Sequence, residues 1–146
     1  MLRRSPLKAK RTTPRRNEGR VQQQRIKPKA TGKTEEQRRY HDWIASLGCL
    51  ACGRPAEVHH VLDACPGKST RRDHWYVAPL CGDIHHRGPQ GVHGLGREKQ
   101  FLAFHGVDLV AWATEARERW GQPEHPFWQD SVTRCRSIFK SKHGLP

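Results

Sequence analysis

The chain has 146 residues and a net charge of +13, and only 34% of its residues are hydrophobic. So small a hydrophobic fraction predicts a small core, and small cores usually need a staple such as a metal ion or a disulfide. The sequence contains no apolar run long enough to cross a membrane and no secretory h-region, so we expect a cytoplasmic protein without membrane contact. Its five cysteines should then stay reduced, which favours metal ligation over disulfides.

The positive charge is concentrated in residues 1–33. This segment holds twelve Lys or Arg and one acid, a net +11, whereas residues 34–146 hold fifteen basic and thirteen acidic residues, a net +2. Three prolines, a glutamine run and few large apolar side chains predict a disordered arm. We expect this arm to bind DNA, because it lacks the aromatic and leucine face of a membrane-surface helix. The alternative is a solvated leader without a partner.

Nine basic residues are the predicted DNA contacts. Seven belong to the arm and two to a turn-rich loop over residues 63–74, in which Lys68 is a further candidate. They are Arg3, Arg4, Lys8, Lys10, Arg11, Arg15, Arg16, Arg71 and Arg72.

An α+β domain is predicted for residues 34–146. Thr34 and Gln37 have the spacing of a capping box, and Asp108 is a helix N-cap candidate. Hydrophobic periodicity supplies the rest of the prediction. In chain order, the expected elements are a helix over 34–47, strands over 56–62 and 75–80, and helices over 95–105, 108–121 and 129–140.

Two short-spaced groups of cysteine and histidine predict a zinc site. Cys49 and Cys52 form a CxxC pair, and Cys81 is followed four residues later by His85-His86. A hairpin between the two groups would bring four tetrahedral sulfur and nitrogen ligands together, as structural zinc requires. A redox CxxC is the alternative, but the thioredoxin-like βαβ setting is absent. Cysteines 65 and 135 are expected to be free thiols.

The adjacent pair His59-His60 stands at the end of a predicted strand. Neighbouring side chains on a strand point to opposite faces, so the two histidines should have different roles. One role can be binding a divalent ion and the other accepting a proton from water, as in a metal-dependent nuclease. The alternative is a pair of ordinary surface or zinc-binding histidines.

Taken together, these motifs resemble the zinc-containing HNH (ββα-metal) endonuclease family over about residues 40–105. The matching pattern is Cys49-x2-Cys52, Glu57-x-His59-His60, Val77-Ala-Pro-Leu-Cys81 and His85-His86. The segment His86-Arg-Gly-Pro-Gln-Gly-Val-His93-Gly, with the basic arm, further resembles the phage recombination-enhancement nuclease (Ref) family. Enzymes of that family cut DNA where a RecA filament is loaded.

The resemblance implies a ββα-metal core over about 49–105, C-terminal helices over 108–140 and a metal-dependent DNA endonuclease. It also implies a recombination or repair role in a phage-infected or lysogenic bacterial cell, with DNA and a RecA-type filament as partners. His60 would be the general base, with a pKa near neutrality, and Mg²⁺ or another divalent ion would be the catalytic ion. The implied ligands are His59, His93 and His86 for the catalytic ion, with His93 favoured over His86, and Cys49, Cys52, Cys81 and His85 for the structural zinc.

The chain departs from the family pattern in two places. The usual C-x2-C-H is here C-x3-H-H, which leaves the choice between His85 and His86 for the zinc open. The middle Asn of HNH is missing, since the only Asn is Asn17 and the corresponding position falls near Trp75 or Tyr76. Two other functions stay open: a non-catalytic zinc-containing DNA-binding module, and a protein-interaction adaptor, which explains neither histidine cluster.

Overall fold

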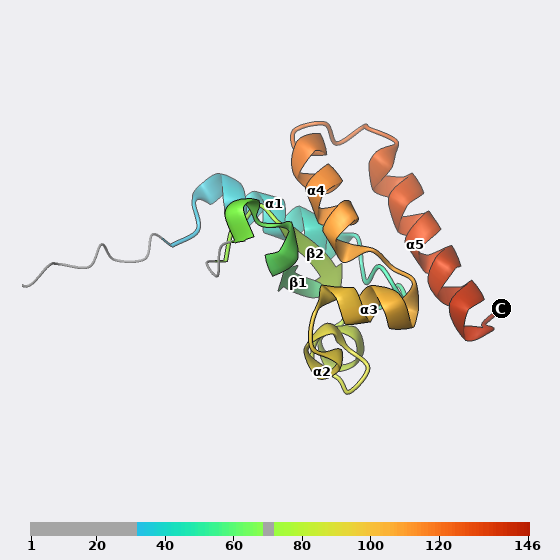
Figure 1. The fold of residues 1–146 in the computed structure, drawn as a ribbon. Coiled ribbons are helices and arrows are strands. Elements are labelled where there is room, and N and C mark those ends of the chain that lie inside the picture. The colour runs from blue at the N-terminus through green and yellow to red at the C-terminus, as the bar shows by residue number, and fades with distance from the viewer. Residues whose placement is uncertain (1–31, 69–71) are drawn as a thin grey trace, which may run out of the picture. The chain divides into compact units, whose positions relative to one another are not determined.

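The computed structural model describes residues 32–68 and 72–146 (Figure 1). Most of the predicted basic arm and Arg71 therefore lie outside the described residues. Within them, the chain is of the α+β class, with two strands and several helices. No helix in these ranges is long and apolar enough to span a membrane.

The first helix, α1 (Glu35–Ser46), begins with the predicted capping box. The Thr34 hydroxyl accepts a hydrogen bond from the Gln37 amide at 3.2 Å, and the Gln37 side chain accepts one from the Thr34 amide at 2.9 Å. Tyr40 and Ile44 on the inner face are fully buried, and α1 packs against the sheet. The helix therefore supplies a wall of the domain and carries His41, which is also buried, toward the end of the sheet.

The sheet is one antiparallel hairpin, β1 (Glu57–His60) with β2 (Val77–Leu80). Its register pairs Glu57 with Leu80 and His60 with Val77. Both strands are shorter than predicted. Strand β1 ends because the chain turns after Val61 into two short 3-10 turns, Leu62–Ala64 and Pro66–Lys68, and β2 starts late because residues 74 and 75 form a turn. All four residues of β2 are buried, so this strand forms the centre of the core.

After β2 the chain makes a π-helical turn (Gly82–His86), a short helix α2 (Val92–Leu95) and helix α3 (Glu98–His105). The predicted helix over 95–105 is thus split. Gly96 has φ +116°, a backbone conformation that side chains disfavour, and Arg97 is extended. As a result, α3 begins at Glu98, and this start places its first residue beside β1.

Two long helices complete the domain: α4 (Leu109–Arg119) and α5 (Phe127–His143). The Asp108 carboxylate caps α4 by accepting from the Ala111 amide at 2.9 Å. Helix α5 is longer than the predicted 129–140, because Phe127 and Trp128 in its first turn are buried. In Figure 1 α4 lies next to the sheet and α5 stands beyond it, and α4 contacts both α5 and β2.

Candidate functional site

Four cysteine and histidine side chains that could hold a metal ion meet at one end of the hairpin. Cys49 and Cys52 come from the tight turn of residues 49–53 before β1, which we call the knuckle. Cys81 and His85 come from the turn after β2. Their separations are 3.7 Å between the sulfurs of Cys52 and Cys81 and 3.2 Å from Cys81 Sγ to His85 Nδ1. Cys49 Sγ lies 3.5 Å from the same nitrogen. These spacings are close to the edges of about 3.5–3.8 Å expected around one tetrahedral zinc ion.

The knuckle is held in place by α5. The Arg136 guanidinium donates to the Cys49 carbonyl at 3.2 Å and to the Leu47 carbonyl at 2.8 Å. Gly53, with φ +74°, closes the knuckle in a left-handed backbone conformation that favours glycine. Burial lowers the pKa of His85 to about 4, so the ring is neutral and can offer a lone pair.

The π-helical turn directs the two adjacent histidines to different places. His85 joins the cysteines, whereas His86 joins His59 and His93 in a second cluster. Within this second cluster, ring centroids are 5.0 Å apart for His59 and His86, 5.4 Å for His59 and His93, and 4.8 Å for His86 and His93. The structure therefore brings together the two ligand sets that the sequence suggested and gives His85 to the first and His86 to the second.

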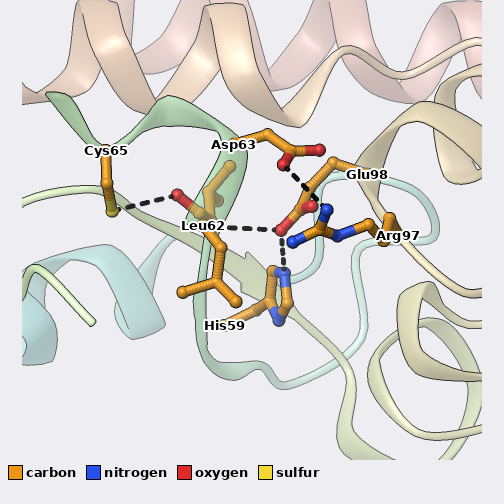
Figure 2. A network of polar contacts seen from close by, with 7 residues as sticks. His59, Leu62, Asp63, Cys65, Arg97 and Glu98 are labelled. Atoms are coloured by element: carbon orange, nitrogen blue, oxygen red, sulfur yellow. Dashed lines mark hydrogen bonds and ion pairs between the residues drawn. The ribbon is translucent and has the colours of Figure 1, made fainter. Parts of the chain in front are cut away.

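A buried carboxylate accepts a hydrogen bond from one ring nitrogen of His59 (Figure 2). Glu98, the first residue of α3, accepts from His59 Nε2 at 3.2 Å and from the Leu62 amide at 3.1 Å. Burial alone would raise the pKa of Glu98, but the hydrogen bonds from His59 and the two backbone amides hold it below its usual value. Because the ionised carboxylate can only accept, His59 carries its proton on Nε2 and leaves Nδ1 free to ligate.

A second carboxylate, that of Glu57, accepts a hydrogen bond from His86 in the same way. Glu57 Oε1 accepts from His86 Nδ1, and Arg87 donates to both Glu57 oxygens. Burial tends to raise the pKa of Glu57, but the hydrogen bonds from His86 and Arg87 lower it overall. His86 is therefore left with Nε2 free, and two carboxylates bring negative charge to the cluster. Metal-binding histidines usually have such partners on the nitrogen that does not ligate.

The segment from His86 to Gly94 is folded so tightly that only glycine fits at positions 88, 91 and 94. A methyl group on Gly94 would come within 2.2 Å of the Gly88 carbonyl oxygen, and one on Gly88 would lie 2.5 Å from the Ile84 carbonyl oxygen. Both contacts are far inside van der Waals distance. The close packing holds His93 beside His59, and it explains the Gly-rich spacing of this segment.

We expect Gly94→Ala to displace His93 and to reduce cleavage activity at least as much as loss of the His93 ring. The physical reason is the backbone clash at 2.2 Å, which no side-chain rotation can relieve. Gly32→Ala is the matched control, because a methyl group there meets no atom within 4 Å and the residue has no left-handed φ. Cleavage rates of the two variants at equal folded fraction measure the effect, and equal rates would contradict it.

A pocket of about 580 Å³ opens beside the His59 cluster. Besides the histidines and Glu98, three arginines contribute to its lining: Arg72, Arg87 and Arg97. Arg87 is held by Glu57, and Arg97 lies 3.9 Å from Asp63 at the surface (Figure 2). Guanidinium groups around a pocket favour a phosphate ligand.

His60 lines the same pocket, but its ring also contacts a group that the sequence did not indicate. Its Nε2 lies 3.0 Å from Nδ1 of His74, and the ring of His41 is 5.6 Å away. Burial, followed by the nearby His41, His74 and Arg72, lowers the pKa of His60 to about 4. The predicted near-neutral pKa is therefore wrong for this structure, because a partly buried imidazole beside Arg72 and two further imidazoles resists protonation.

Sequence reasoning missed Glu98 and the His41–His74 group, and it assigned no role to Glu57. Glu57 had a signal, since it is two residues before His59 and so shares its face of the strand. Glu98 had none, because helical periodicity does not reveal which residue starts a helix. His41 and His74 meet only through the packing of α1 against the sheet.

We expect Glu98→Ala to weaken binding of a divalent ion by about 10–100-fold, the usual effect of losing such a carboxylate partner. Glu98→Gln should fall between wild type and Glu98→Ala, since it keeps an acceptor oxygen but loses the charge. Asp63→Ala, which removes the neighbouring surface carboxylate of Figure 2, is the control. Metal titration followed by calorimetry is the measurement, and affinities equal to wild type in all three variants would contradict the role of Glu98.

Three comparisons with known proteins complete the description. A family model described as "Recombination enhancement, RecA-dependent nuclease" matches residues 33–130, about two thirds of the chain. Neither the search of curated proteins nor that of solved structures gave a match. This match confirms the resemblance to the recombination-enhancement nucleases, and its range contains both candidate clusters, the pocket and His60. The chain therefore belongs to the family of recombination enhancement, RecA-dependent nucleases.

Proposed function

We propose that this protein is an HNH-type, metal-dependent endonuclease that hydrolyses phosphodiester bonds of DNA and acts with a RecA filament in recombination or repair. One observation carries the proposal. His59, His86 and His93 converge in an arginine-lined pocket, and two of these rings have their second nitrogen bound by a carboxylate. A general base candidate, His60, lies on the rim of the same pocket.

The donor set fits a divalent ion. His59 Nδ1, His86 Nε2 and one nitrogen of His93 would hold it, with Glu98 and Glu57 fixing the orientation of two of the rings. Three imidazoles suit manganese, nickel or zinc as well as Mg²⁺. When bound, such an ion supplies positive charge that stabilises a phosphoryl oxygen and the leaving 3′ oxygen.

The other groups of the pocket have separate roles in the proposed hydrolysis. Arg72, Arg87 and Arg97 would bind the phosphate backbone and align the scissile bond. His60 is neutral at pH 7, so it can take a proton from the attacking water as the oxygen approaches phosphorus.

We further propose that the Cys49, Cys52, Cys81 and His85 cluster binds a structural zinc ion. Its support is the near-tetrahedral spacing of the four ligand atoms and the burial of three of the four residues. The ion would join the knuckle before β1 to the turn after β2. Since His86 is the next residue after His85, this zinc would also fix the backbone of the cluster formed by His59, His86 and His93.

Cleavage of plasmid DNA with and without a RecA filament, at matched Mg²⁺ or Mn²⁺ concentrations, tests the proposed function. We expect cleavage that needs both the ion and the filament. No cleavage under any of these conditions, combined with tight DNA binding, would instead favour a non-catalytic zinc-containing DNA-binding module. The carboxylate partners of His59 and His86 argue against that module, because simple DNA binding has no use for them.

We expect removal of residues 1–32 to leave a folded domain with much lower DNA affinity. The deletion keeps Lys33, which contacts His41, and it removes eleven basic residues and Glu18, a charge of +10. For every phosphate that the shortened protein no longer neutralises, the slope of log affinity against log salt should fall by about 0.9. Binding isotherms of full-length and shortened protein at several salt concentrations measure this slope. Equal slopes would assign DNA binding to the loop with Arg71 and Arg72 instead.

A further inference from the structure

Two further histidines, His41 and His74, form a separate group with His60. His60 ends β1, His41 belongs to α1, and His74 stands three residues before β2. The register pairs His60 with Val77, so residue 74 lies just beyond the end of the hairpin. His60 Nε2 is 3.0 Å from His74 Nδ1, and His41 Nε2 is 2.8 Å from the His74 carbonyl oxygen.

The hydrogen bonds determine where the protons of His41 lie. A carbonyl oxygen only accepts, so His41 Nε2 carries a proton and donates it to His74. His41 Nδ1 then has a lone pair, which accepts from the Lys33 ammonium at 3.3 Å. Both nitrogens of the neutral His41 ring are thus engaged, and the His74 backbone is anchored to α1.

A metal ion is a poor occupant for this group, although its three rings are close enough to hold one. His41 has no free lone pair, and the neighbouring charges of Lys33 and Arg72 are positive. Among the residues that the structure describes, no carboxylate hydrogen bonds to any of these rings. The group is therefore better suited to orient His60 than to bind an ion.

We propose that His74 is a positioning residue for the general base His60, and that His41 holds His74 in place. This inference rests on the proposed function. His60 would donate its Nε2 proton to Nδ1 of His74, which leaves the lone pair of His60 on Nδ1, toward the attacking water. When the O–H bond of water breaks, its proton forms an N–H bond at His60 Nδ1, and His74 keeps accepting from the imidazolium. His74 thus takes over the orientation of the base in a chain that lacks the HNH asparagine.

Substitutions at His74 separate this role from a structural one. His74→Leu removes the acceptor and should lower the single-turnover cleavage rate by about 10²-fold, the usual cost of a misplaced reacting group. Its DNA affinity should stay within about twofold of wild type. His74→Asn places an oxygen where Nδ1 stood and should recover most of the rate. His125→Leu, at a histidine outside the pocket, is the matched control and should cleave like wild type.

The side-chain ¹⁵N spectrum of the histidines tests the same point without activity. In the full-length protein, His60 should be in the Nε2–H form, and His74→Leu should convert it to a mixture of both tautomers. Unchanged cleavage in His74→Leu, failure of His74→Asn to restore it, or an Nδ1–H form of His60 in wild type would each overturn the proposal. The proposal would also be overturned if the wild-type protein held a metal ion that His74→Leu no longer binds. If His60→Ala cleaves like wild type, another group activates the water and this inference fails, although the proposed nuclease function stands. If the wild-type protein itself cleaves no DNA, the proposed function fails, whereas the tautomer result still stands.

Discussion

Replacement of Cys81 by serine should unfold the domain at neutral pH. Structural zinc sites in small domains contribute about 10–16 kcal/mol of apparent binding free energy, which is as large as the whole stability of most domains. Cys81 also connects β2 to the turn that carries His85 and His86, so its loss would disturb both clusters. Circular dichroism and zinc analysis of the purified variant are the measurements.

Cys65→Ser is the matched control for this experiment. Cys65 is also buried, but it lies outside the cluster and donates only to the Val61 carbonyl, which a serine hydroxyl can reach as well. We expect this variant to fold and to retain one tightly bound zinc per chain. A folded Cys81→Ser protein with wild-type stability would show that the cluster does not staple the fold.

His60→Ala should lower the rate of DNA cleavage by about 10²–10⁴-fold, the usual cost of losing a general base. The fold and the affinity for DNA should remain, because His60 is only partly buried and belongs to neither ligand cluster. Single-turnover cleavage with RecA-coated DNA measures the rate, and a filter or fluorescence assay measures the affinity.

The control for His60 is His125→Ala, at a histidine far along the chain just before α5. Addition of imidazole provides a second check, since a small base that enters the vacated space should restore part of the rate. Cleavage by His60→Ala at the wild-type rate would mean that another group activates the water.

Much of the candidate site was readable from the sequence, because its ligands lie in short local patterns. The CxxC pair and the Cys81–His85 pair flank two strand-like segments, and a hairpin is the simplest way to bring them together. Cys49 and His85 are 36 residues apart, yet their ligand atoms lie within 3.5 Å. The choice between His85 and His86 needed the structure, since it depends on the π-helical turn after Cys81.

The parts that sequence could not supply depend on packing between distant elements. Glu98 reaches His59 only because Gly96 and Arg97 break the predicted helix and let α3 start beside β1. His41 meets His74 only because α1 packs against the sheet, and no local pattern marks either residue. The length of β1 was mispredicted for a related reason. Tertiary contacts, and not β propensity, set the turns after Val61 that end this strand.

The most direct test of the central claim is the dependence of DNA cleavage on divalent ions in wild type and His93→Ala. The zinc-loaded proteins are freed of weakly bound ions by a mild chelator, and Mg²⁺ or Mn²⁺ is titrated back with RecA-coated DNA present. We predict saturable activation of wild type, and in His93→Ala a much lower rate that needs a higher ion concentration. Identical activation curves for the two proteins, or full wild-type cleavage before any ion is added, would contradict a metal-dependent nuclease centre at His59, His86 and His93.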